Sequence, residues 1–93
     1  MAADGHRLLV ISVETVDGSR AECVVRSLHG PASVGTVYRM PFPSDDTVEL
    51  TEIEWYGQAR QVLDEMHHGK VCLVGPGAAA LRAEDALVVQ EQV

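Results

Sequence analysis

Apolar and polar residues alternate over residues 7–16, which is the pattern of a β-strand with one buried face. The apolar positions that we expect to face the core are Leu9, Ile11 and Val13. The Asp17-Gly18 pair that follows is typical of a tight hairpin turn, because glycine adopts positive φ at no steric cost. A second alternating run over residues 21–28 completes a predicted hairpin. Its expected core positions are Ala21, Cys23 and Val25.

Four later runs predict strands over residues 34–40, 47–56, 70–74 and 87–89. Glycine and proline separate these runs, since proline removes a backbone donor and glycine permits sharp turns. The breaks are His29-Gly30-Pro31, the loop 41–46 and Gly75-Pro76-Gly77. Within 47–56 the alternation slips between Leu50 and Ile53, which predicts a β-bulge.

Two stretches have the spacing or composition of helices. The apolar residues of 58–67 recur at intervals of three and four, and they are Ala59, Val62, Leu63 and Met66. The alanine-rich segment 78–85 has high helix propensity. Propensity alone therefore predicts an α+β domain, with one helix near residues 58–67 and a short one over 78–85.

The order of these signals along the chain resembles the second domain of translational GTPases of the elongation factor Tu type. The matching landmarks are Val34-Gly35 before a strand, Leu63-Asp64-Glu65 and Gly69 before an apolar strand, and Leu81 to Leu87 at the place of an Ile-x-x-Gly-Asp-x-Leu motif. The chain departs from the family at two points. Glu84 replaces the glycine of the last motif, and the Gly-Arg that the family has before Val25 is missing.

The resemblance covers residues 7–89 and implies the fold of that family, an all-β, closed, antiparallel six-stranded barrel with one or two short helical turns. We therefore expect one barrel domain over 7–89, a flexible N-terminal tail over 1–6 and a C-terminal tail over 90–93. A closed barrel has no open sheet edges, which suits a small isolated β domain. In place of a helix over 58–67, the resemblance implies a short strand and one helical turn. It also implies a translation-linked accessory that binds RNA or tRNA as an alternative function.

Charge argues against that alternative. The chain has 93 residues, with 14 acidic and 7 basic side chains and a formal net charge of -7. The basic residues are scattered along the sequence, whereas nucleic acids and anionic membranes attract clustered cations. We therefore expect no nucleic acid and no membrane as partner. No apolar run approaches the ~20 residues of a membrane span, and residues 1–6 lack the apolar segment of a signal peptide, so we expect a cytoplasmic protein.

The residues with potential for chemistry do not form a recognisable catalytic motif. Cys23 and Cys72 both lie in apolar runs, so we expect two reduced, buried thiols. His67 and His68 are adjacent, and adjacent side chains point in different directions, so we interpret them as a solvated turn. A small metal-binding or hydrolytic protein that uses these histidines is a further alternative. With no phosphate-binding glycine loop and no paired catalytic carboxylates, we expect no enzyme activity, no catalytic residues, no metal and no cofactor.

The adjacent aromatic residues Trp55 and Tyr56 are the best candidates for contact with a partner. Neighbours on a strand point to opposite faces, so one of them should pack on the core and the other should be exposed. Tyr38 and Phe42 join them if the loop 41–46 folds over the same side. The sequence therefore predicts a non-enzymatic interaction or accessory module whose partner is another protein. Its predicted contact residues are Trp55, Tyr56, Tyr38 and Phe42.

Overall fold

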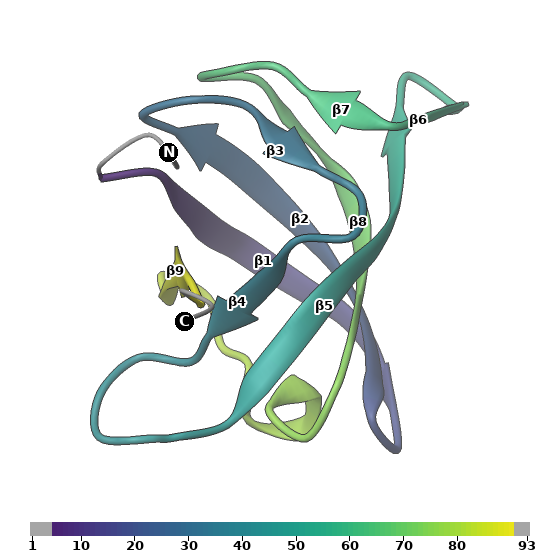
Figure 1. The fold of residues 1–93 in the computed structure, drawn as a ribbon. Helices are drawn as coiled ribbons and strands as arrows, with labels where there is room; N and C mark the ends of the chain where they lie inside the picture. Colours follow the sequence, from purple (N-terminus) through teal and green to yellow (C-terminus); the bar gives the residue numbers. More distant parts are fainter. Residues whose placement is uncertain (1–4, 91–93) are drawn as a thin grey trace.

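The computed structural model describes residues 5–90 and consists almost entirely of β-strands (Figure 1). The strands are β1 (Arg7–Asp17), β2 (Arg20–Leu28), β3 (Ala32–Ser33), β4 (Val37–Arg39), β5 (Thr47–Trp55), β6 (Gln58–Arg60), β7 (Val62–Leu63), β8 (His68–Val74) and β9 (Ala86–Val89). A 3-10 turn, η1 (Ala78–Ala80), is the one helical element within this range. None of the described segments forms a helix long and apolar enough to cross a membrane.

Six strands close into an antiparallel barrel, which confirms the predicted fold class. Around the ring the order is β4, β9, β1, β2, β8 and β5, and β5 pairs back onto β4. Each of these pairings is antiparallel. β6 extends the sheet beside the last residues of β5. β3 and β7 form a separate two-stranded sheet, at the upper end of the barrel in Figure 1.

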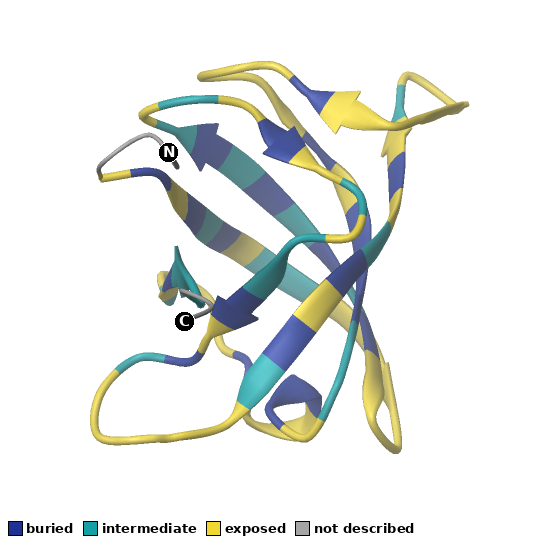
Figure 2. Ribbon diagram, in the orientation of Figure 1, coloured by how far each residue is buried: buried dark blue, intermediate teal, exposed yellow. Residues whose placement is uncertain are grey.

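Every strand of the ring contributes buried residues to the barrel interior, and these are aliphatic or small except for Tyr38 of β4. Figure 2 shows how buried and more exposed positions alternate along β1, β2 and β5. β2 alternates as predicted, and its buried residues are Ala21, Cys23, Val25 and Ser27. The predicted facing of β1 is wrong at Leu9 and Ile11, because Leu8 and Val10 are fully buried and Ile11 is 41% exposed, whereas Val13 packs against the core as predicted. Residues 8–11 are all apolar, so their sequence does not select which alternate positions face the core. Two register shifts follow, after Val10 and after Val13, and the first returns Val13 to the core side. Each bulge adds a residue to one strand and so reverses which positions face the core.

Two other strand predictions differ in detail from the structure. The strand predicted over 34–40 is reduced to β4 (Val37–Arg39), because Gly35, between β4 and the preceding β3, bends the chain at a φ of 98°. Its N–H donates to the carbonyl of Leu50 over 2.7 Å, which fastens this bend to β5. The predicted bulge in β5 is confirmed by a register shift between Leu50 and Glu52.

The helix predicted from propensity near residues 58–67 does not form, so this prediction is wrong. This segment forms β6 and β7, which pair with β5 and β3, so backbone pairing prevails over helix propensity. Of the residues at helical spacing, Leu63 is buried and Ala59, Val62 and Met66 are exposed. The helix predicted over 78–85 is reduced to η1.

The predicted tails lie mostly outside the described residues, which exclude 1–4 and 91–93. His6 belongs to the predicted N-terminal tail, yet it is only 9% exposed and lies against the barrel. Its Nδ1 lies 3.0 Å from the carbonyl oxygen of Leu28. The packed part of the barrel therefore begins at least one residue before the predicted boundary.

Candidate protein-contact site

Tyr56 stands at the tip of the hairpin that joins β5 to β6. Trp55 pairs with Gln58, so Tyr56 and Gly57 form a two-residue turn. Their φ angles are 51° and 77°, and positive values at both positions define a type I′ turn. Glycine adopts this conformation freely, whereas tyrosine is strained there by about 1 kcal/mol or more. The turn projects Tyr56 into solvent, where it is 85% exposed.

The indole ring of Trp55, the last residue of β5, contacts three other side chains. The indole is half-buried and packs against the core, so one aromatic of the pair faces inward and the other outward, as strand alternation predicts. His67 is nearly parallel to it, with ring centroids 5.4 Å apart. The guanidinium carbon of Arg60 is 5.3 Å from the indole centroid, which is cation–π range. Tyr56 meets Trp55 edge to face, with centroids 4.7 Å apart.

A groove runs along each side of this cluster. The first groove, of about 310 Å³, is bounded by Trp55, Arg60 and His67 and by β7. The second, of about 220 Å³, is bounded by Trp55 and Tyr56 and by His68 and Lys70 of β8. Trp55 lines both grooves, so the aromatic residues form a ridge between two hollows. Side chains of a partner protein can enter the grooves on either side of these aromatic residues.

Two more apolar side chains are exposed near this ridge. Val62, which lines the first groove, is 44% exposed, and Met66, next to His67, is 55% exposed. Met66 also has a positive φ, 69°, and its N–H donates to the carbonyl of Ser27 over 2.6 Å. We call these residues together the aromatic end: Trp55, Tyr56, Arg60, Val62, Met66 and His67. Two strained backbone positions that each expose a large apolar side chain are typical of a contact surface rather than of a core.

Gly69 lets β8 pass close to Trp55. A Cβ atom at this position would lie 3.0 Å from the carbonyl oxygen of Glu54 and 3.2 Å from Cδ1 of Leu63. Both contacts are shorter than ordinary van der Waals distance, and one is to backbone. A larger residue would therefore separate β8 from β5 and displace the indole that supports the aromatic end.

The structure does not bring Tyr38 and Phe42 to the aromatic end. Tyr38 is fully buried, and its hydroxyl lies 2.8 Å from Nε2 of His6, so it is a core residue rather than a surface contact. Phe42 is 96% exposed in the loop before β5, whereas Tyr56 follows the end of β5. A nine-residue strand spans about 30 Å, so these two aromatics lie at opposite ends of β5 (Figure 1).

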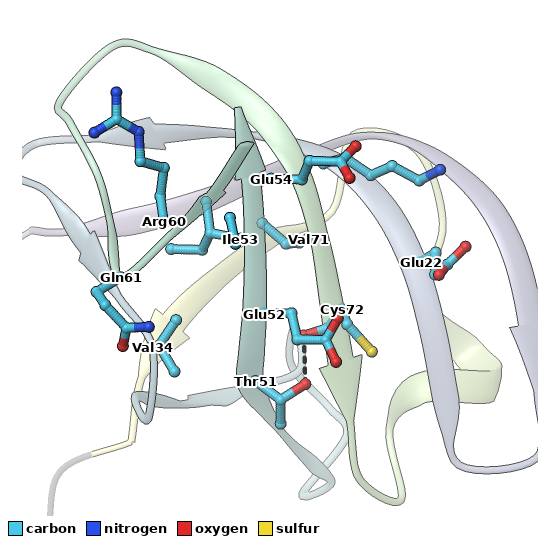
Figure 3. Close-up of a pocket in the computed structure, with 12 residues that line it drawn as sticks. Glu22, Val34, Thr51, Glu52, Ile53, Glu54, Arg60, Gln61, Val71 and Cys72 are labelled. Atoms are coloured by element: carbon cyan, nitrogen blue, oxygen red, sulfur yellow. Dashed lines mark hydrogen bonds between the residues drawn. The ribbon is translucent and has the colours of Figure 1, made fainter. Parts of the chain in front are cut away.

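A hollow of about 280 Å³ on the outer face of β2, β8 and β5 contains carboxylates and a thiol (Figure 3). Arg20 lies 4.0 Å from Glu22 and 3.8 Å from Glu52, and its Nε donates to Sγ of Cys72 over 2.8 Å. This hydrogen bond to the sulfur raises the pKa of Arg20. The carboxylates are paired with a guanidinium rather than with each other. We therefore interpret this hollow as a surface ion-pair network that covers Cys72.

The histidines and cysteines are not assembled into a metal site or a catalytic pair. No group of three or more His, Cys, Asp or Glu side chains among residues 5–90 is arranged to hold a metal ion. His67 stacks on Trp55, whereas His68 belongs to β8 and lines the other groove. Cys23 and Cys72 are both free and buried, as predicted. Cys23 faces the core, where burial raises the pKa of its thiol to about 11.

Arg60, Val62, Met66 and His67 are the members of the aromatic end that sequence reasoning did not select. The turn that begins at Tyr56 folds β6 and β7 back beside β5, and this fold-back is what brings them to Trp55. The sequence signal for it was the Tyr56-Gly57 pair followed by a short polar run. A scan of the sequence against protein-family models and a search of curated proteins both find no match.

Proposed function

We propose that this protein is a non-enzymatic interaction module that binds another protein through the aromatic end of its barrel. The observation that carries the proposal is Tyr56, a large aromatic side chain that is 85% exposed on a strained turn. Asparagine or glycine would fit the backbone of this turn at lower cost, so the turn conformation does not account for a tyrosine here. Tyrosine and tryptophan are the residues that most often dominate binding energy at protein interfaces.

The surroundings of Tyr56 support this role. Trp55 holds it from below by an edge-to-face contact, which limits its freedom before binding and so lowers the entropic cost of association. Arg60 adds a guanidinium on the indole, and arginine is also enriched at protein interfaces. The two grooves beside Trp55 can accept partner side chains on both sides of the aromatic residues.

The test is affinity capture from lysate of the cells that make this protein. The bait is the wild-type chain or Tyr56→Asn, and Phe42→Ser serves as a control in which an equally exposed aromatic is removed elsewhere. We expect a protein that is captured by the wild type and by Phe42→Ser but not by Tyr56→Asn. Identical captured proteins with all three baits would contradict the proposal.

A kinship with the second domain of translational GTPases is a second proposal, and the closed antiparallel six-stranded barrel supports it. The tRNA-linked function that this kinship implies is the alternative to a protein partner. Titration of fluorescently labelled tRNA with the protein at physiological salt separates the two. We expect no change in anisotropy, because a chain of net charge -7 repels a polyanion. Saturable, salt-sensitive binding would favour the alternative.

A further inference from the structure

Strand register brings together three arginines that are far apart in the sequence. Val88 of β9 pairs with Arg7 of β1 on one side and with Arg39 of β4 on the other. Arg26 of β2 pairs with Leu9, two residues after Arg7 on β1. Residues directly opposite on antiparallel strands point to the same face, and alternate residues of one strand do too. The three guanidinium groups therefore project from one continuous face of β4, β9, β1 and β2.

This face is the outside of the barrel. The alternate positions Leu8, Tyr38 and Leu87 are fully buried, which fixes their neighbours Arg7, Arg39 and Val88 on the outer surface. Arg7 and Arg39 are exposed, and each lies one strand spacing from Val88, so their Cα atoms are about 10 Å apart. Long side chains from these two positions can reach the same group. We call Arg7, Arg26 and Arg39 the arginine face.

The arginine face has no ion pair of its own in the described part of the chain. Both salt bridges found there belong to Arg20, which shares the outer face of β2 but lies six residues from Arg26, at the other end of the strand. Arg26 Nε is buried and has no hydrogen-bond partner among residues 5–90. The chain has 14 acidic and 7 basic side chains, yet three of the seven gather here without an ion pair to any carboxylate of residues 5–90. Such an arrangement favours an external anion.

Apolar side chains lie between and beside these arginines. The half-buried ones on the strands are Leu9, Leu28 and Val88. At the edge, a cleft of about 400 Å³ is lined by Arg7, Arg39 and the 96% exposed Phe42, together with Asp45 of the same loop. The surface thus alternates guanidinium groups with apolar contacts, and it holds one aromatic ring.

We propose that the arginine face is a second docking surface, for an acidic peptide segment that alternates carboxylate and apolar side chains. Carboxylates of the segment pair with Arg7, Arg26 and Arg39, and its apolar residues contact Val88, the two leucines and Phe42. Nucleic acid fits this face less well, because one aromatic ring supports at most one stacked base and the net charge of -7 opposes a long polyanion. This surface is separate from the aromatic end and does not depend on Tyr56.

The experiment measures fluorescence anisotropy of a labelled peptide of alternating glutamate and leucine during titration with the protein. We expect saturable binding that weakens as salt is raised. Arg7→Gln and Arg39→Gln should each weaken binding about two- to fivefold, as for exposed ion pairs, and the variant with all three arginines replaced should abolish it. The charge-matched control is the triple variant Arg20→Gln, Lys70→Gln and Arg82→Gln, which should bind as the wild type does.

Further variants and probes distinguish this proposal from the alternatives. Tyr56→Asn should bind the acidic peptide as the wild type does. This test therefore does not depend on whether the aromatic end binds a protein. A peptide of alternating lysine and leucine should not bind. Absence of binding by the acidic peptide, or equal loss in the two triple variants, would overturn the proposal. So would a labelled single-stranded RNA that binds the arginine face more tightly than the peptide does.

Discussion

The hydroxyl of Tyr38 lies 2.8 Å from Nε2 of His6 in the barrel interior, which joins the N-terminal segment to β4. The other ring nitrogen, Nδ1, lies 3.0 Å from the carbonyl oxygen of Leu28, which can only accept a hydrogen bond. In the neutral ring Nδ1 is therefore the donor, and Nε2 accepts from the tyrosine hydroxyl. Through these two bonds, His6 links β2 to β4 across one end of the barrel.

Replacement of Tyr38 by phenylalanine should destabilise the fold. The substitution removes one hydroxyl and leaves Nε2 of the buried His6 without a partner, which costs about 1–3 kcal/mol in the free energy of unfolding. Urea denaturation followed by circular dichroism measures this loss. Tyr56→Phe is the matched control and should leave stability unchanged, because Tyr56 is exposed. Equal stabilities of Tyr38→Phe and the wild type would show that the hydrogen bond contributes nothing.

The stability of the protein should fall in alkaline solution through Cys23. Burial, with smaller contributions from nearby Cys72 and Glu14, raises the pKa of this thiol from 9.0 to about 11. The unfolded chain therefore loses the thiol proton at lower pH than the native chain does. The thiol's contribution, on the order of 2 kcal/mol, is fully present below pH 9 and is lost as the pH rises from 9.0 to about 11.

Urea denaturation of the wild type and of Cys23→Ala across this pH range tests the prediction. The variant is less stable at neutral pH because it loses buried volume, but its free energy of unfolding should decline less steeply above pH 9. Burial also raises the pKa of Tyr38, so some decline remains in both proteins. Parallel curves for the two proteins would exclude Cys23 as the source of the effect.

Tyr56→Asn should separate stability from binding. Asparagine relieves the strain of a positive φ but loses the edge-to-face contact with Trp55, and each effect is about 1 kcal/mol. We expect a free energy of unfolding within about 1 kcal/mol of the wild type, together with loss of partner capture. A drop in stability well beyond that, measured by thermal or urea unfolding, would make Tyr56 a structural residue.

Zinc should leave the melting temperature unchanged. A ligand that binds only the native state raises the melting temperature by mass action, and a metal site would do so. His67 is engaged in the stack on Trp55, and His68 lines a different groove, so the pair does not present two ligands to one ion. A reproducible rise with zinc that His68→Ala abolishes would support the metal-binding alternative instead.

Local patterns predict most of the strands and turns, whereas the closed barrel is predicted only by the resemblance to the second domain of translational GTPases. β2 alternates without interruption, and the turn predicted at Asp17-Gly18 forms at Gly18-Ser19, between the paired residues Asp17 and Arg20. The facing predicted for Leu9 and Ile11 of β1 is wrong, because residues 8–11 are all apolar and the bulge that brings Val13 back to the core has no local signature. The helix expected over 58–67 failed for a similar reason. Pairing with β5 and β3 decides that segment, and such contacts are not visible in local propensity.

The candidate sites depend even more on contacts between strands that the local sequence does not reveal. Trp55 and Tyr56 could be selected from the sequence because they are adjacent aromatics at a strand end. The stack of His67 on Trp55 could not, since it requires knowledge of how the chain returns through β6 and β7. Arg7 and Arg39 are scattered in the sequence, and only the closure of the ring through β9 places them on either side of Val88. The grouping of charged side chains on the barrel surface is therefore set by strand register rather than by their spacing in the sequence.

The central claim is that Tyr56 contacts a protein partner, and photo-crosslinking tests it most directly. The protein carries benzoylphenylalanine in place of Tyr56 or, as a control, of Val16, which is 46% exposed on the distant hairpin of β1 and β2. Both proteins are irradiated in lysate of the native cells. We predict a crosslinked protein from position 56 but not from position 16, and its yield should fall with excess wild-type protein but not with Tyr56→Asn. Equal crosslinking from the two positions, or equal competition by both competitors, would contradict the claim.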